Sequence, residues 1–143
     1  IPLDYPSYEE EIQVVKGTTS MQTQQLRHIV TGEQILFFQQ LIRKVPIADN
    51  VLEYAVSLAT KSRPNTPRAT PKVNEYISWG AGPRASQYLV LGAKCHAAIR
   101  GKYSPDIEDV QAVAKYVLRH RVVRNYKAEA EGISEDAIIE SLF

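Results

Sequence analysis

The sequence predicts an all-α protein, a helical bundle of roughly five or six helices joined by short loops. Apolar residues recur at the helical spacing i, i+3 and i+4 along most of the 143 residues. Capping motifs, in which a Ser or Thr is followed three residues later by Glu or Gln, precede two of these stretches. No convincing pair of strands is present, and 44% hydrophobic with 23% charged residues is typical of a globular domain with its own core.

The first part of the chain predicts three helices. A capping box at Ser7–Glu10 opens a helix that runs to about Lys16, with glutamates at its positive end. A second capping box at Thr31–Gln34 opens the next helix, which ends at Pro46. The apolar stripe of that second helix is Ile35, Phe38, Leu41, Ile42 and Val45. The stripe of the third helix is Val51, Tyr54, Ala55 and Leu58. Residues 21–30 show no clear period and predict an irregular segment.

The middle of the chain predicts a loop and two helices of different character. Arg63–Lys72 contains three prolines and predicts the most mobile loop of the molecule. Val73–Trp79 predicts a short helix. Arg84–Arg100 is apolar on nearly every side, which predicts a central buried helix, and Gly101 is expected to end it.

The last part of the chain predicts one long helix and two shorter elements. Ser104, Pro105 and Asp106 supply a cap, a first-turn proline and an acid for the long helix. Its expected buried face is Ile107, Val110, Val113, Ala114, Val117 and Leu118. Residues 125–132 predict a short helix or a turn, and Ser134 is expected to cap a final helix.

Composition excludes several classes of protein. The single cysteine, Cys95, rules out an internal disulfide framework and predicts a reducing, cytoplasmic compartment. A net charge of +1 predicts no strong attraction to nucleic acid or acidic lipid, and no apolar run is long enough for membrane insertion. The chain starts without Met and without a signal peptide, so we expect a piece cut from a longer protein.

Metal and nucleophile chemistry is not expected. Cys95 and His96 lie within the predicted buried helix, where a cysteine is usually a packing residue. His28 and His120 are far apart and have no acidic or histidine partner at ligand spacing, so we expect no metal site.

A basic cluster at residues 119–127 allows two interpretations. The cluster consists of Arg119, His120, Arg121, Arg124 and Lys127. It could bind nucleic acid, but cations are also favourable at the end of a helix, and Glu129 and Glu131 lie close by in sequence. The structural interpretation is favoured, since sequence-independent DNA binding needs many unopposed cations.

The stretch Ser78–Ser86, SWGAGPRAS, contains the strongest candidate site. Pro83 is suited to the first position of a helix, which puts Arg84 in the first turn, where partial positive charge makes a cation unfavourable. An anion at this helix end would remove the repulsion, and a guanidinium matches phosphate oxygens. The alternative is that Arg84 pairs with a carboxylate from elsewhere in the fold, and the spacing does not decide between the two.

These residues carry a resemblance to a known family. Gly80-Ala81-Gly82-Pro83-Arg84-Ala85 is similar to the "GASPRA" motif that opens the sensor-2 helix in the lid of MoxR-type AAA+ ATPases, with Gly82 in place of the usual serine. Asp4-Tyr5-Pro6-Ser7 resembles the junction between ATPase core and lid. Val117–Arg121 followed by Asn125–Gly132 is similar to the family's "VLRHR…YEAEAEG" ending, so the resemblance covers essentially the whole chain.

The resemblance implies a site and its cofactors. It implies that Arg84 is the catalytic sensor-2 arginine at the γ-phosphate, and that Gly82 and Ala85 lie at the nucleotide beside it. Residues 1–6 would end the ATPase core, and residues 7–143 would form the lid. The phosphate-binding loop and the acids that position Mg²⁺ are not in this sequence, so ATP and Mg²⁺ are expected only with a core that precedes Ile1. This chain alone is therefore not expected to hydrolyse ATP, whereas its parent is.

The resemblance also implies partners. The lid would contact its own core and the neighbouring subunits of a ring, expected to be a hexamer, and the parent would remodel von Willebrand A-domain proteins in a chaperone-like manner. No nucleic acid and no membrane are expected among the partners. The alternatives are a helical nucleic-acid-binding module that uses residues 119–127, and a plain protein-interaction domain.

Overall fold

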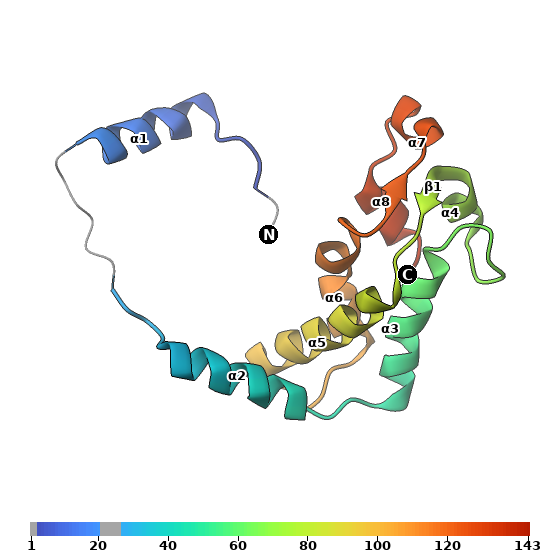
Figure 1. Ribbon diagram of the computed structural model, residues 1–143, viewed down its shortest axis with the longest axis horizontal. Coiled ribbons are helices and arrows are strands. Elements are labelled where there is room, and N and C mark those ends of the chain that lie inside the picture. The colour runs from blue at the N-terminus through green and yellow to red at the C-terminus, as the bar shows by residue number, and fades with distance from the viewer. Residues whose placement is uncertain (1–2, 21–26) are drawn as a thin grey trace. The chain divides into compact units, whose positions relative to one another are not determined.

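The structure is a computed structural model that describes residues 3–20 and 27–143. The described residues contain eight helices and one pair of short strands (Figure 1). The all-α class is confirmed. The number of helices exceeds the expected five or six because residues 73–79 and 125–132, where the sequence predicted at most short elements, each contain part or all of a short helix. The chain divides into two compact units, residues 1–35 and residues 36–143.

The first unit contains α1 (Tyr8–Thr19) and the beginning of α2 (Gly32–Lys44). The capping box at Ser7 is confirmed, with the Glu10 N–H donating to Ser7 Oγ and the Ser7 N–H to the Glu10 carboxylate. The α1 helix continues beyond Lys16, and the hydroxyls of Thr18 and Thr19 donate to carbonyls one turn earlier. Residues 27–30 contain no helix or strand, and the rest of the segment predicted to be irregular lies outside the described residues.

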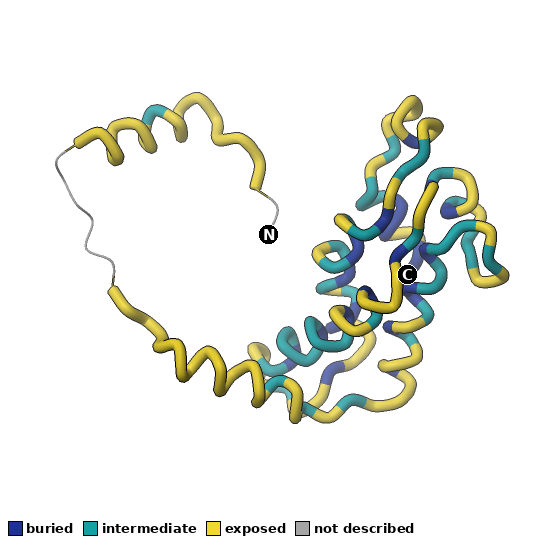
Figure 2. The backbone as a smooth tube through the Cα atoms, viewed as in Figure 1, coloured by how far each residue is buried: buried dark blue, intermediate teal, exposed yellow. Residues whose placement is uncertain are grey.

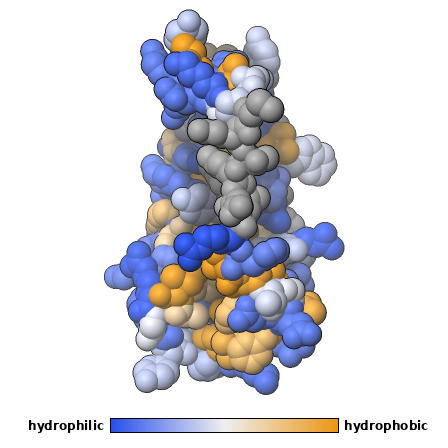
Figure 3. All heavy atoms as spheres, turned by 90° about the vertical axis from the view of Figure 1, so that its left-hand side faces the viewer, coloured by the Kyte–Doolittle hydropathy of each residue, from blue (hydrophilic) through white to orange (hydrophobic). Residues whose placement is uncertain are grey.

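The α2 helix begins at its predicted capping box, where the Thr31 N–H donates to Gln34 Oε1 and the Gln34 N–H donates to Thr31 Oγ1. No residue of α2 is buried, so the apolar stripe that the sequence indicated is not covered by other described residues. Five of its large apolar side chains are between 45% and 60% exposed: Ile35, Leu36, Phe37, Phe38 and Leu41. Figures 2 and 3 show this exposed helix and the apolar side chains on its surface.

The second unit is built around three helices, α3 (Asp49–Lys61), α5 (Pro83–Ile99) and α6 (Ile107–Leu118) (Figure 1). The α5 helix contacts both of the others more extensively than they contact each other, so it is central as predicted. Its buried residues are Ala85, Leu89, Ala93 and Ala97, which form one stripe rather than an apolar cylinder. A β-carbon at Gly92 would lie 3.1 Å from Val113 Cγ2, so the missing side chain permits the close approach of α5 and α6.

The ends of α5 and α6 are defined by their caps. Gly101 has φ +72 and follows the last turn of α5, where the N–H groups of Lys102 and Gly101 donate to the carbonyls of Ala97 and Ala98. The prediction that Gly101 ends this helix is confirmed. The prediction for the next helix is wrong by two residues, because Asp106 and not Ser104 caps α6, in a reciprocal pair with Asp109.

Two short strands join segments that are distant in sequence. The expected helix over residues 73–79 is divided into α4 (Pro71–Tyr76) and β1 (Ile77–Trp79). β1 pairs antiparallel with β2 (Val123–Arg124), which corrects the expectation of no strand pair. A two-residue strand has no measurable period, so the sequence contained no signal for it. Trp79, at the end of β1, is 74% exposed.

The remaining elements close the second unit. The expected loop at 63–72 ends at Thr70, which caps α4, and Pro71 is the first residue of α4. The last helices, α7 (Tyr126–Ala130) and α8 (Glu135–Glu140), begin at the side-chain caps of Asn125 and Ser134. Ile138 and Ile139 of α8 belong to the same core cluster as buried residues of α3, α5 and α6. Among the described residues, no helix combines the length and apolar composition needed to cross a bilayer.

Candidate functional site

Arg84 lies in the first turn of α5, as predicted, and its side chain is exposed. Across residues 3–20 and 27–143, no carboxylate pairs with Arg84 and no hydrogen bond engages its side chain. The described part of the chain therefore does not supply the carboxylate partner that was one of the two alternatives for this arginine.

The start of α5 is open in front of Arg84. Gly82 is the N-cap, in an extended conformation, and no side chain caps the first turn. A β-carbon at Gly82 would have no atom within 4 Å, so the space next to this helix end is unobstructed. Pro83 has no N–H and the Ala85 N–H is bonded to Gly82, so the first turn offers the Arg84 N–H and the partial positive charge of the helix end. With the Arg84 guanidinium beside them, they fit an anion such as a phosphate group.

The three residues expected at the nucleotide differ in how they could contact it. Gly82 and Arg84 are exposed, whereas the Ala85 side chain is fully buried in the core. The Ala85 N–H donates to the Gly82 carbonyl at 2.9 Å. Gly82 and Arg84 thus face the open space, and Ala85 anchors the first turn of α5 from the inner side.

The turn before α5 is held against the end of α3. A β-carbon at Gly80 would lie 2.3 Å from the Ser62 carbonyl oxygen and 2.5 Å from Arg63 Cα, so only glycine fits there. The Ala81 N–H donates to the buried Ser62 hydroxyl at 2.9 Å, and Ser62 Oγ donates to the Ala59 carbonyl at 2.7 Å. Arg63 Nε donates to the Ala81 carbonyl at 2.8 Å. We call Ser62, Arg63 and the turn Gly80–Ala81 the α3–α5 clamp.

The sequence did not reveal the α3–α5 clamp. Ser62 and Arg63 follow a predicted helix at the start of a proline-containing loop, where such residues are common. Their partners lie 18 and 19 residues further along the chain. The signal present in the sequence was Gly80, since a glycine before a helix can indicate a close backbone approach.

The basic cluster is largely neutralised by acids of the same unit. Arg119 forms a two-bond ion pair with Asp136, at 2.8 and 2.5 Å. Lys127 Nζ lies 2.5 Å from Glu75 Oε1. Arg124 Nε lies 2.7 Å from Glu135 Oε1, and this second contact is an ion pair whose geometry is not that of a hydrogen bond. These acids are not the two glutamates that sequence proximity suggested, although Glu131 also lies 3.8 Å from Lys127.

The remaining arginine of the cluster, Arg121, has a packing role. The Arg121 guanidinium lies 5.0 Å from the centre of the Tyr88 ring, and its Nη1 donates to the Val117 carbonyl and contacts His120. The cations at 119–127 therefore join α6 and the strand β2 to their neighbours, which favours the structural interpretation over nucleic-acid binding.

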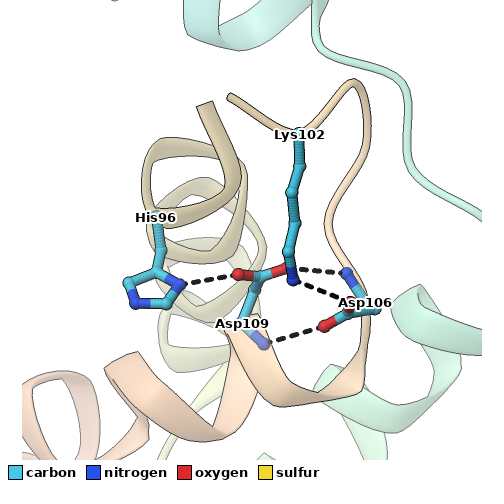
Figure 4. Close-up of polar contacts among 4 residues, drawn as sticks. All are labelled: His96, Lys102, Asp106 and Asp109. Atoms are coloured by element: carbon cyan, nitrogen blue, oxygen red, sulfur yellow. Dashed lines mark hydrogen bonds and ion pairs between the residues drawn. The ribbon is translucent and has the colours of Figure 1, made fainter. Parts of the chain in front are cut away.

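A polar cluster that the sequence did not predict joins the end of α5 to the start of α6 (Figure 4). Asp109, whose side chain is almost fully buried, lies 2.6 Å from His96 Nδ1 through one oxygen. Its other oxygen accepts from Lys102 Nζ at 3.0 Å and from the Asp106 N–H at 2.9 Å. Lys102 also pairs with Asp106 at 2.8 Å. The partners are separated in sequence by the turn at Gly101, so no local motif indicated all of them.

Hydrogen bonds decide the ionisation of Asp109. Burial alone would raise the pKa of this carboxyl, but bonds from the Asp106 N–H, His96 and Lys102 lower the pKa well below the ordinary value of 3.8. Asp109 is therefore a charged group at neutral pH in a buried, fully bonded position. This arrangement stabilises the junction of α5 and α6 and lies at the opposite end of α5 from Arg84.

Metal binding and the thiol of Cys95 are the other candidate chemistry of the described residues. These residues contain no group of three or more His, Cys, Asp or Glu side chains that could hold a metal ion. Cys95 is a free, half-buried thiol. Arg84, with the open helix end, is thus the site whose geometry best fits a ligand.

The second unit is a small helical bundle. Arg84 lies at an open helix start, which follows a glycine turn held against the end of α3. This combination points to the class of a helical lid. The AAA lid domain family matches residues 70–142, just over half of the chain, so the chain belongs to this family. Among curated proteins, Chaperone MoxR1 of Mycobacterium tuberculosis is 31% identical over 97% of this chain and 37% of its own length. The chain is thus an AAA lid domain that is similar to the corresponding part of a MoxR-type protein and of a candidate ATPase.

Two further relatives extend the comparison. Uncharacterized protein YeaC of Bacillus subtilis is 26% identical over 98% of this chain and 41% of its own length. The crystal structure of a candidate ATPase from Cytophaga hutchinsonii is 33% identical and matches with a TM-score of 0.81, over 98% of this chain and 43% of that one. The chain thus spans about two fifths of the length of these relatives.

Proposed function

We propose that Arg84 is the sensor-2 arginine of this lid and contacts the γ-phosphate of ATP bound by a core that precedes the lid. The observation that carries the proposal is the unpaired, exposed guanidinium of Arg84 among the described residues, at a helix start with no side-chain cap. A cation in the first turn of a helix costs about 0.3–1 kcal/mol. An anion that lies next to both the Arg84 guanidinium and the positive helix end is attracted to both, and this attraction offsets the cost.

The role of Arg84 follows from the chemistry of phosphoryl transfer. ATP with Mg²⁺ supplies the transferred phosphoryl group, and charge on its oxygens must be neutralised in the transition state. A guanidinium can donate two parallel hydrogen bonds to such oxygens. Gly82 leaves room for the close approach of an anion, and the buried Ala85 fixes the first turn that carries Arg84.

We further propose that lid movement couples the nucleotide state to work on a partner protein. Closure of the lid would bring Arg84 to the nucleotide, and opening would withdraw it. Residues 1–6 would then belong to the end of the core, and the lid would contact neighbouring subunits in a ring. The name of the relative MoxR1, a chaperone, supports a chaperone-like remodelling activity. Von Willebrand A-domain proteins are the partners to test first.

The experiment is a turnover measurement on the full-length ATPase with Arg84→Ala. Loss of a charge that supplies about 3 kcal/mol in the transition state lowers turnover roughly 10²-fold. Arg84→Lys should recover only part of the loss, because it keeps the charge without the planar fork. The matched control is Arg68→Ala, which removes another exposed arginine, and it should leave turnover unchanged. Normal turnover of Arg84→Ala would refute the sensor-2 assignment.

A further inference from the structure

We propose that Arg63, together with Ser62, is a positioning residue that holds Arg84 in place through the α3–α5 clamp. The inference rests on the proposed function of Arg84. It adds that the end of α3, a different helix, sets where this guanidinium can reach.

The clamp holds Ala81 by both of its backbone groups. Its N–H donates to Ser62 Oγ at 2.9 Å, and its carbonyl accepts from Arg63 Nε at 2.8 Å. The Ala81 side chain is fully buried as well, so this residue has no freedom to turn. Only Gly82 and Pro83 separate it from Arg84, and the proline ring fixes its own φ.

The far side of Arg84 is equally fixed. Ala85 is fully buried in the core, and its N–H bonds to Gly82. The backbone of Arg84 therefore lies between two anchored alanines, of which one is anchored by the core and one by Ser62 and Arg63. Without the clamp, the turn Gly80–Ala81 could move away from α3, and the first turn of α5 would lose one of its two supports.

The α3 end of the clamp is itself well supported. Ser62 Oγ donates to the Ala59 carbonyl inside the last turn of α3, and the Arg63 N–H donates to the Thr60 carbonyl. The Arg63 carbonyl accepts from the Thr66 hydroxyl at 2.9 Å. The backbone of Arg63 is thus fixed at the end of α3, which suits its side chain to define the position of a neighbouring turn.

The hydrogen bond from Nε, rather than the charge, is the feature that the proposal assigns to Arg63. The side-chain amide nitrogen of glutamine stands the same number of bonds from the backbone as Nε of arginine. Arg63→Gln therefore keeps a donor for the Ala81 carbonyl and removes the charge, whereas Arg63→Ala removes both. This pair separates positioning from a direct charge effect on the nucleotide.

The test is a double-mutant cycle in the full-length ATPase, with Arg63→Ala, Arg84→Ala and both together. Arg63→Ala should lower kcat roughly 10-fold, since a displacement of about 1 Å can cost up to 10²-fold, with a smaller effect on KM. In the Arg84→Ala background it should have no further effect. Arg63→Gln should stay within about threefold of the wild type, like the control Arg68→Ala.

The outcomes distinguish the two proposals. If Arg84→Ala lowers turnover and Arg63→Ala multiplies that loss, Arg63 does not act through Arg84, and this inference fails while the proposed function stands. If Arg63→Gln is as slow as Arg63→Ala, the charge and not the hydrogen bond matters, which also overturns the inference. Normal turnover of Arg84→Ala would overturn the proposed function and the inference with it. Equal thermal unfolding of the Arg63→Gln and wild-type proteins verifies that folding is intact.

Discussion

Replacing Gly80 with alanine tests whether the α3–α5 clamp fixes the start of α5. The added β-carbon would lie 2.3 Å from the Ser62 carbonyl oxygen, whereas ordinary contact begins near 3.4 Å. The atoms in the way belong to backbone, so no side chain can turn aside. The turn must move by about 1 Å, the difference between these two distances. Both hydrogen bonds of Ala81, at 2.9 and 2.8 Å, are then lost.

The expected cost combines two effects. Steric overfilling costs about 1–3 kcal/mol, and each lost hydrogen bond costs about 1 kcal/mol. We expect Gly80→Ala to lower the free energy of unfolding by about 3–5 kcal/mol. A domain of this kind has about 5–15 kcal/mol of total stability, so the variant should unfold at a clearly lower urea concentration.

The assay is urea unfolding of the wild-type and variant chains, followed by far-UV circular dichroism. Gly82→Ala is the matched control, since its β-carbon meets no atom within 4 Å and its φ of −77 suits alanine. The control should change stability by no more than about 0.5 kcal/mol, because a poorer N-cap is offset by a less flexible unfolded chain. Equal unfolding curves for the two variants would refute the argument that the contact with Ser62 and Arg63 fixes this turn.

Three further predictions concern other parts of the chain. Asp109→Asn should cost about 3 kcal/mol at pH 7, because it leaves buried partners of a charge unpaired. The folded pKa of Asp109 is lowered below 3.8, so its stabilisation is complete above that pH and is lost as the pH falls further. The difference in unfolding free energy between wild type and variant should therefore shrink as the pH falls below 3.8, and a difference that does not change with pH would contradict this prediction. Arg84→Ala in the isolated chain should leave stability unchanged or raise it by a few tenths of a kcal/mol in thermal unfolding, and a clear loss would indicate a structural partner. The chain should not retard duplex DNA at ~150 mM salt in a gel assay; retardation abolished by Arg121→Ala with Arg124→Ala would support the nucleic-acid alternative.

Local signals in the sequence predicted most of the fold. The capping boxes at Ser7 and Thr31 were found because their partners lie three residues apart. Gly101 was found because a helix end with positive φ favours glycine. The exposed α2 was not foreseen, since an amphipathic period indicates a face that can be covered and does not say by what.

Contacts between distant segments could not be predicted. The pairing of β1 with β2 joins residues more than 40 positions apart in a register that only the folded chain defines. The candidate site was predicted in part, because Arg84 opposes the charge of its own helix end, whereas Ser62 and Arg63 have no unusual feature in sequence. The buried Asp109 was missed for a similar reason, since its pairing with His96 spans the turn between two helices.

The position of Trp79 gives the chain a natural optical reporter. It is the sole tryptophan, it is 74% exposed, and it directly precedes Gly80 at the end of β1. An indole in water emits at long wavelength, so an event that covers this segment shifts the emission to shorter wavelength and changes its accessibility to quenchers. Binding of a ligand or partner that covers the start of α5 can therefore be followed in real time in this chain by intrinsic fluorescence, without attaching a dye beside Arg84.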